Sequence, residues 1–128
     1  METVELAGRI LIVDDDPDLC ALLIELLALE GITAHAVASP AEGCLALEQE
    51  SFALILVDSF APVFSEAAMD RLQPLRSNAA GTPMVLFTAH DDADQVDLTK
   101  YGLAGRLLKP FEADDLLALV RQYVAPSM

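Results

Sequence analysis

Basic residues are scarce in this sequence, and their scarcity excludes one broad class of function. The 128 residues include 7 Lys and Arg against 21 Asp and Glu, so the formal net charge is −14 at pH 7. Binding to nucleic acid depends on clusters of Lys and Arg that neutralise phosphates, and direct nucleic acid binding is therefore not expected. A divalent cation or a basic protein partner suits such a surface better.

Disulfide frameworks and long apolar runs are also absent from the sequence pattern. The two cysteines, Cys20 and Cys44, form no CxxC motif, and we expect reduced, half-buried helix residues, with a disulfide or redox pair as the alternative. The longest apolar stretch, residues 19–29, contains Glu25 and is shorter than the roughly 20 residues of a membrane span. We therefore expect no membrane insertion and a cytoplasmic location.

The composition that remains is that of a globular protein. Hydrophobic residues make up 54% of the chain and charged residues 22%, which is typical of a folded domain. The length suits one domain, residues 1–128, with a core that needs neither disulfides nor a structural metal.

Short apolar runs alternate along the chain with segments of helical pattern. Helix starts are marked by a capping residue followed by proline, as in Asp16-Pro17 and Ser39-Pro40. The runs predict strands at 9–13, 32–37, 52–57, 83–89 and 105–109, and helices at 17–30, 40–50, 65–76, 91–101 and 112–123. This alternation predicts an α/β fold, a parallel sheet with helices on both faces.

The right-handed crossover rule narrows the topology to a doubly wound sheet, and the order 2-1-3-4-5 is expected for five strands. In that order a ligand crevice lies at the carboxyl ends of the first and third strands. The first strand is followed by Asp14, Asp15 and Asp16, and the third by Asp58. Acidic residues therefore converge where such a fold binds ligands.

Clustered carboxylates need a physical explanation. Two unit charges 4 Å apart repel by roughly 4 kcal/mol at an effective dielectric near 20, so the cluster must be protonated, paired or bound to metal. Oxygen ligands with room for water suit Mg²⁺. Capping of the following helix is the alternative; it accounts well for Asp16 and Asp18 and less well for Asp14, which directly follows the strand.

Two further residues are expected at the same edge of the sheet. Thr88 closes the fourth predicted strand, and Lys109 closes the fifth. A metal-bound carboxylate, a hydroxyl and an ammonium together can hold a phosphoryl group, and Asp58 can accept it covalently.

Four short motifs in this order make the chain similar to the receiver domain of two-component response regulators, which has a flavodoxin-like (βα)5 fold. The resemblance implies that Asp58 is the phosphoacceptor, that Asp15 binds Mg²⁺ directly and that Asp14 acts through water. It also implies a third metal ligand in the backbone carbonyl of Phe60. Thr88 and Lys109 would contact phosphoryl oxygens, Thr88 as the switch residue. The motifs are "ILIVDDDPD", "LILVD", "VLFTA" and "LLKPF".

The resemblance also implies a function and its partners. A sensor histidine kinase or a phosphotransfer protein would donate the phosphoryl group, and the signal would pass to a downstream protein through protein contacts. Such a domain promotes its own phosphorylation and dephosphorylation and is not a turnover enzyme acting on a separate substrate.

Two alternatives remain open at this point. The stretch after the acceptor departs from the family pattern at Ala61 and Glu66, and Arg106 replaces the usual aromatic residue. These changes put the ordinary switching mechanism in doubt, though not the phosphorylation chemistry, and the altered loop favours a pseudo-receiver that binds partners without phosphorylation. A phosphatase of the haloacid dehalogenase type also uses an Asp-x-Asp motif, but Asp18 does not fit that motif and the chain is too short for a cap domain.

Overall fold

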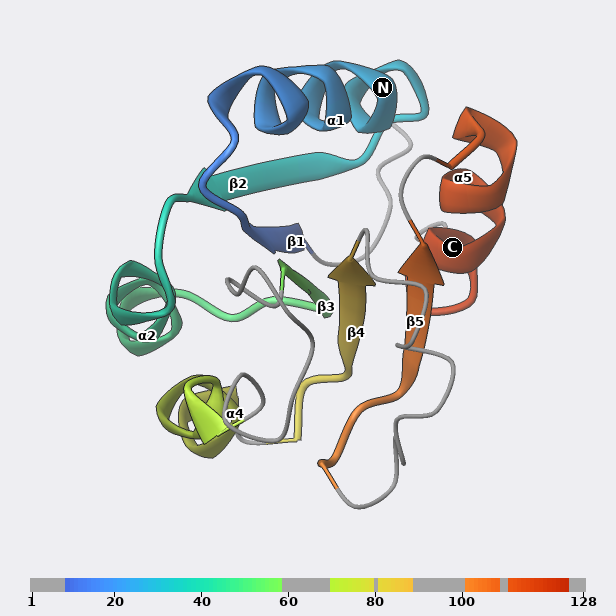
Figure 1. Cartoon of the computed structure of the whole chain (residues 1–128). Helices are drawn as coiled ribbons and strands as arrows, with labels where there is room; N and C mark the ends of the chain where they lie inside the picture. Colours follow the sequence, from blue (N-terminus) through green and yellow to red (C-terminus); the bar gives the residue numbers. More distant parts are fainter. Residues whose placement is uncertain (1–8, 59–69, 80, 89–100, 109–110, 125–128) are drawn as a thin grey trace, which may run out of the picture.

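Five parallel strands form one sheet in a computed structural model that describes residues 9–58, 70–79, 81–88, 101–108 and 111–124. The strand order is β2-β1-β3-β4-β5, which confirms the predicted doubly wound, flavodoxin-like topology (Figure 1). The strands are β1 Arg9–Val13, β2 Thr33–Val37, β3 Leu54–Asp58, β4 Met84–Thr88 and β5 Gly105–Leu108.

Four helices are described, and they cover both faces of the sheet. Figure 1 shows α1 and α5 on one side of the strands and α2 and α4 on the other. Their bounds are α1 Pro17–Leu29, α2 Pro40–Gln49, α4 Gln73–Ala79 and α5 Ala113–Arg121. Within these ranges no helix has the length and apolar character needed to cross a membrane.

One predicted helix differs in its bounds from the observed helix, and most of another lies outside the described residues. The helix predicted at 65–76 is observed as α4, which extends to Ala79; its last turn is supported by the Asn78 side chain, whose amide donates to the Pro74 carbonyl at 2.8 Å. Residues 65–69 and most of the helix predicted at 91–101 fall outside the described ranges.

The predicted helix caps are present and explain where the first two helices begin. The carboxylate of Asp16 accepts hydrogen bonds from the backbone N–H groups of Asp18 and Leu19, at 3.1 and 3.2 Å. At α2, Ser39 Oγ accepts from the backbone N–H of Glu42 at 3.2 Å, and the Glu42 carboxylate reaches back to the N–H of Ala38 at 2.9 Å. These bonds satisfy backbone donors that the first turn of each helix would otherwise leave free.

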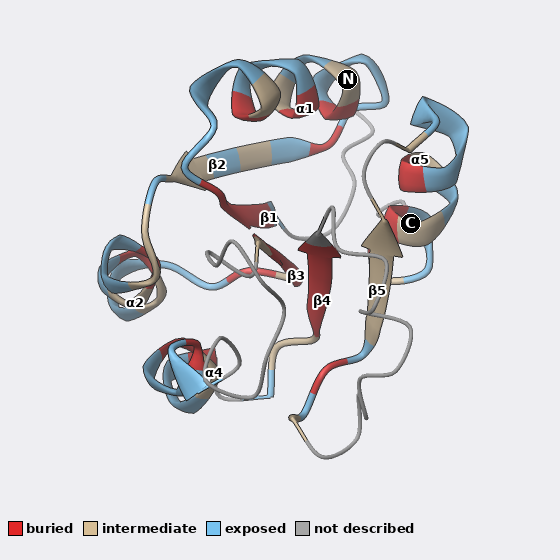
Figure 2. Ribbon diagram, viewed as in Figure 1, coloured by how far each residue is buried: buried red, intermediate tan, exposed pale blue. Residues whose placement is uncertain are grey.

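Strand residues alternate between two hydrophobic cores, one on each face of the sheet. In β1, Ile10 and Ile12 belong to the core beneath α1 and α5, whereas Leu11 and Val13 belong to the core beneath α2 and α4. All four side chains are buried, as Figure 2 shows for the central strands. Because both faces are covered, β1, β3 and β4 read as continuous apolar runs.

The prediction for the cysteines was right in part. Both cysteines are free thiols, and Cys44 is half-buried. Cys20 is buried instead of half-buried, because it lies on the inner face of α1 with Leu23 and Leu27.

Candidate functional site

The register of β1 and β3 assembles three carboxylates at the carboxyl end of the sheet. Val13 of β1 pairs with Val57 of β3, so the residues that follow them, Asp14 and Asp58, lie side by side at the carboxyl end of the sheet. Asp15 joins them, and one carboxylate oxygen from each of the three residues lies within 4.8 Å of the other two. The strand order alone led us to expect this convergence, and the structure places the three residues together.

Asp14 is held in place by its surroundings. Its side chain is only 3% exposed. Its backbone N–H donates to the Val37 carbonyl at 3.1 Å, and its Oδ1 accepts from the backbone N–H of Asp16 at 2.9 Å. Its carbonyl accepts from the Cys20 thiol at 3.4 Å. Buried and bonded from several directions, Asp14 presents its carboxylate from a fixed position.

The other two carboxylates are more open to solvent. Asp58 is half-buried, and Asp15 is exposed. One side of the site is therefore formed by a buried carboxylate and the other by an exposed one. The exposed side leaves room for water around a bound ion. Among the described residues, this is a donor set made only of hard oxygen atoms.

This donor set fits Mg²⁺. Magnesium uses one or two protein carboxylates and completes its octahedron with water and phosphate oxygens. At an effective dielectric near 20, each pair of charges at this separation repels by on the order of 3 kcal/mol, and a divalent cation offsets that repulsion. Helix capping accounts for Asp16, which caps α1 itself, and does not account for the closeness of Asp14 and Asp58.

Thr88 ends β4, at the same edge of the sheet. Asp58 pairs with Phe87, one residue earlier, and Thr88 pairs with Leu108, the last residue of β5. The backbone of Thr88 therefore lies one step beyond that of Asp58 across the β3–β4 pair. The neighbour of Leu108, Lys109, is outside the described residues.

Several other predicted features also lie outside the described ranges. They include Phe60, the predicted third metal ligand, and the altered loop positions Ala61 and Glu66. Arg106 is described: it lies in β5, pairs with Leu86 and is half-buried.

Cys20 is the contact to this site that sequence reasoning missed. Its thiol supports the Asp14 carbonyl from the inner face of α1. The signal was present in the sequence, because Cys20, Leu23 and Leu27 recur at the spacing of one helix face. That face packs on the sheet, and Cys20 on it contacts Asp14, the residue that follows β1.

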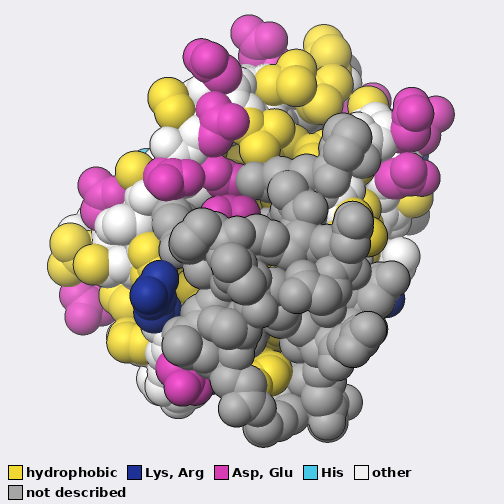
Figure 3. All heavy atoms as spheres, in the orientation of Figure 1, with side chains coloured by type: hydrophobic (Ala, Val, Ile, Leu, Met, Phe, Trp, Pro, Cys, Tyr) yellow, Lys and Arg dark blue, Asp and Glu magenta, His cyan; other side chains and the backbone are white. Residues whose placement is uncertain are grey.

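Acidic side chains extend well beyond the site. Figure 3 shows them over α1 and α5, with few basic side chains on the same face. The negative electrostatic potential of this surface attracts cations toward the carboxylates and repels polyanions.

Comparison with known proteins gives a consistent result. Residues 10–121 match the family model described as the response regulator receiver domain. The transcriptional regulatory protein CpxR of Klebsiella pneumoniae is 38% identical over 115 residues, which cover 89% of this chain and 48% of that protein. The chain thus spans about half the length of that relative.

Solved structures share the fold. A CheY-like response regulator receiver domain protein from Methanospirillum hungatei is 26% identical with a TM-score of 0.76, over 94% of this chain and 93% of that one. The receiver domain of sensor histidine kinase PA1611 from Pseudomonas aeruginosa, solved with magnesium in its active site cleft, is 23% identical with a TM-score of 0.71. That match covers 91% of this chain and 96% of the other. The chain belongs to the response regulator receiver domain family of two-component signalling.

Proposed function

We propose that this chain is a phosphoacceptor module that receives a phosphoryl group on Asp58 in a reaction that depends on Mg²⁺. The observation that carries the proposal is the cluster of Asp14, Asp15 and Asp58, with oxygen atoms within 4.8 Å of one another at the carboxyl ends of β1 and β3. A strand-end carboxylate beside two others is poised to share a cation with them and to act as a nucleophile.

Each aspartate has its own part in this reaction. A carboxylate oxygen of Asp58 attacks phosphorus, and a new O–P bond forms as the bond between phosphorus and the donor breaks. With a phosphohistidine donor, the leaving imidazole takes a proton as it departs. Asp14 and Asp15, with Asp58 and the backbone carbonyl of Phe60, would hold Mg²⁺. When bound, the ion neutralises charge on the phosphoryl oxygens.

Thr88 and Lys109 complete the proposed site. β4 ends at Thr88 and β5 at Leu108, both at the same edge of the sheet as Asp58, which supports this assignment. We assign the Thr88 hydroxyl and the Lys109 ammonium to phosphoryl oxygens, where donors and positive charge stabilise the transferred group.

The partners follow from the chemistry and the family. The phosphoryl donor is a sensor histidine kinase or a phosphotransfer protein, and the output passes to a downstream protein in the cytoplasm. CpxR is named a transcriptional regulatory protein, but the net charge of −14 argues against direct DNA contact by the chain described here. The aspartyl phosphate is a signal, so the chain is not a turnover enzyme on a separate substrate.

The test is phosphorylation by a small-molecule donor. The protein is incubated with acetyl phosphate and Mg²⁺, and its intact mass is measured. We expect a gain of one phosphoryl group in the wild type, with no gain in Asp58→Asn or when the metal is chelated. Asp18→Asn is the matched control, because Asp18 is an exposed aspartate in the first turn of α1 outside the cluster; it should label like the wild type.

Two outcomes would contradict the proposal. Equal labelling of Asp58→Asn and the wild type would move the acceptor elsewhere. A folded wild type that takes up no phosphoryl group with Mg²⁺ present would favour an interaction domain that works without phosphorylation.

A further inference from the structure

Cys20 contacts the loop that carries the acidic residues at two points. It lies in the first turn of α1, on the inner face of that helix, and is 7% exposed. Its thiol donates to the Asp14 carbonyl at 3.4 Å, and its backbone N–H donates to the Asp16 carbonyl at 3.0 Å. One residue of α1 therefore holds the main chain on both sides of Asp15.

A third hydrogen bond connects the two ends of this loop. The backbone N–H of Asp16 donates to Oδ1 of Asp14 at 2.9 Å. Asp14, Asp16 and Cys20 are thus joined in a closed ring of hydrogen bonds, and Asp15 lies between two of its members. The backbone N–H of Asp14 also donates to the Val37 carbonyl of β2 at 3.1 Å, which ties the ring to the sheet.

The ring restrains both peptide groups that flank Asp15. The peptide group before Asp15 contains the Asp14 carbonyl, which accepts from the thiol of Cys20. The peptide group after it contains the N–H of Asp16, which donates to the Asp14 carboxylate. Peptide groups are planar, so a hydrogen bond to one atom restrains the whole plane. With both planes restrained, the side chain of Asp15 starts from a defined position.

This restraint matters more for Asp15 than for Asp14. Asp14 is buried, and the surrounding atoms limit where its carboxylate can lie, whereas Asp15 is exposed and depends on its backbone for its position. Mg²⁺ requires near-ideal octahedral geometry, so displacement of a ligand lowers its affinity. Removal of a group that holds a metal ligand commonly lowers metal affinity by about tenfold or more.

We infer that Cys20 is a positioning residue for the proposed magnesium site. Its thiol holds the Asp14–Asp15 peptide so that the Asp15 carboxylate keeps its place in the cluster, and it acts through Asp15 instead of as a metal ligand. The inference rests on the function proposed above, because it uses the same metal site. Without the thiol, the Asp14 carbonyl loses a donor and the peptide turns toward other donors, including water. Asp15 moves with that peptide.

Two substitutions that differ by one oxygen atom test the thiol. Cys20→Ala removes the donor, and Cys20→Ser replaces it with a hydroxyl. Mg²⁺ is titrated into each folded protein, and the Kd is taken from the shifts of backbone amide resonances. We expect the Kd of Cys20→Ala to rise about threefold to tenfold, because a thiol is a weak donor. The Kd of Cys20→Ser should stay within about twofold of the wild type, because its hydroxyl also donates.

A second measurement is made without metal. Hydrogen exchange of the Asp16 amide reports on the bond that this amide donates to Asp14. In metal-free protein we expect this amide to exchange at least about threefold faster in Cys20→Ala than in the wild type, because the loop opens locally more often. The exchange in Cys20→Ser should resemble that of the wild type. Amides of the buried strand β1 give the reference for changes in overall stability.

Two control variants separate positioning from packing. Leu27→Val also shortens a buried side chain on the inner face of α1, but it lies about two turns beyond Cys20. Cys44→Ala removes the other free thiol, which is half-buried in α2. Both variants should bind Mg²⁺ with the Kd of the wild type and leave the exchange of the Asp16 amide unchanged relative to β1.

Four results would overturn the role of Cys20. They are a wild-type Kd in Cys20→Ala, an equal rise of the Kd in Leu27→Val, an equal rise in Cys20→Ser, or unchanged exchange of the Asp16 amide in Cys20→Ala.

Labelling by acetyl phosphate at saturating Mg²⁺ is measured on the same samples. A wild type that binds Mg²⁺ but takes up no phosphoryl group would contradict only the function proposed for Asp58. A labelled wild type together with an unchanged Kd in Cys20→Ala would contradict only the role of Cys20. A wild type that does not bind Mg²⁺ would overturn both.

Discussion

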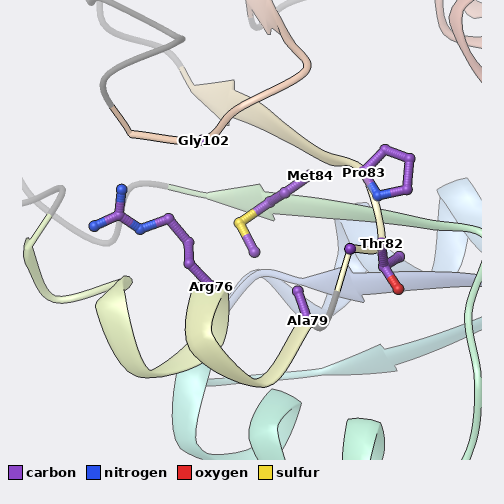
Figure 4. Close-up of a pocket in the computed structure, with 7 residues that line it drawn as sticks. Arg76, Ala79, Thr82, Pro83, Met84 and Gly102 are labelled. Carbon is purple, nitrogen blue, oxygen red and sulfur yellow. The ribbon is translucent and has the colours of Figure 1, made fainter.

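Charged side chains are arranged differently at the two ends of the sheet. At the carboxyl end, three carboxylates gather within 4.8 Å, and one of them is buried. Near the amino end of β4 (Figure 4), the Arg76 guanidinium sits among neutral acceptors with a buried N–H that no described residue satisfies. Like charges in a cluster and a cation among neutral groups both cost folding energy. The carboxylate cluster is the reason why we propose a bound cation at the carboxyl end of the sheet.

The largest expected effect is the gain in stability on binding Mg²⁺, which should depend on the carboxyl end of the sheet and not on the amino end. At a free concentration one hundred times its Kd, Mg²⁺ raises the free energy of unfolding by about 2.7 kcal/mol through mass action. We expect Asp15→Asn to lose most of this gain and Arg76→Gln to retain it. The measurement is thermal unfolding with and without Mg²⁺. A gain of equal size in Asp15→Asn and the wild type would show that the cation binds elsewhere.

Removal of one charge should have opposite effects at the two ends. Without metal, Asp58→Ala relieves repulsion in the cluster, and we expect the free energy of unfolding to rise by about 1–2 kcal/mol. Arg76→Gln removes the bond to the Tyr101 carbonyl and the contact with its ring, and we expect a fall of about 1–2 kcal/mol.

Urea unfolding in a chelator measures both variants under one condition. A loss of stability in metal-free Asp58→Ala would show that repulsion does not dominate at the carboxyl end. A gain in Arg76→Gln would show that the unsatisfied N–H outweighs the bonds the side chain makes.

The exposed ion pairs should matter least. Arg121 pairs with Glu30 across α5 and the end of α1, and Arg9 pairs with Glu50 near the start of β1. Each of the four side chains is 33% exposed or more. Ion pairs as exposed as these contribute at most about 1 kcal/mol. Arg121→Gln should therefore lower the free energy of unfolding by less than Arg76→Gln does. A larger loss of stability in Arg121→Gln than in Arg76→Gln would show that an exposed ion pair contributes more than the contacts of Arg76.

Strand positions were predictable because the central strands are buried on both faces. β1 was predicted at 9–13 and is observed there. β3 was predicted at 52–57 and is observed at Leu54–Asp58. Phe52 is apolar because it packs in the core, not because it pairs in the sheet, and Asp58 is a strand residue because it pairs with Phe87. Hydrophobic pattern locates such strands well and their ends poorly.

The aspartate cluster was predictable for a topological reason. Once five alternating units imply the order 2-1-3-4-5, the ends of β1 and β3 must be neighbours, and the residues at those ends are visible in the sequence. Its finer features were not predictable, since the burial of Asp14 and the support from Cys20 depend on how α1 packs against β1.

The contact between Arg76 and Tyr101 had no sequence signal. Arg76 meets Tyr101 across 25 positions of the chain, through a contact that neither hydrophobic period nor motif predicts. In the sequence, Arg76 was simply the last residue of an expected helix. A cation with neutral partners becomes visible only when packing is known.

The most direct test of the phosphoacceptor assignment is to locate the phosphoryl group itself. After labelling with acetyl phosphate and Mg²⁺, reduction by borohydride converts the aspartyl phosphate to homoserine, which peptide mass spectrometry then places in the chain. The account predicts homoserine at position 58 in the wild type, and none at that position when Mg²⁺ is withheld. Homoserine at position 14 or 15 in place of 58, or equal reduction at position 58 without metal, would contradict it.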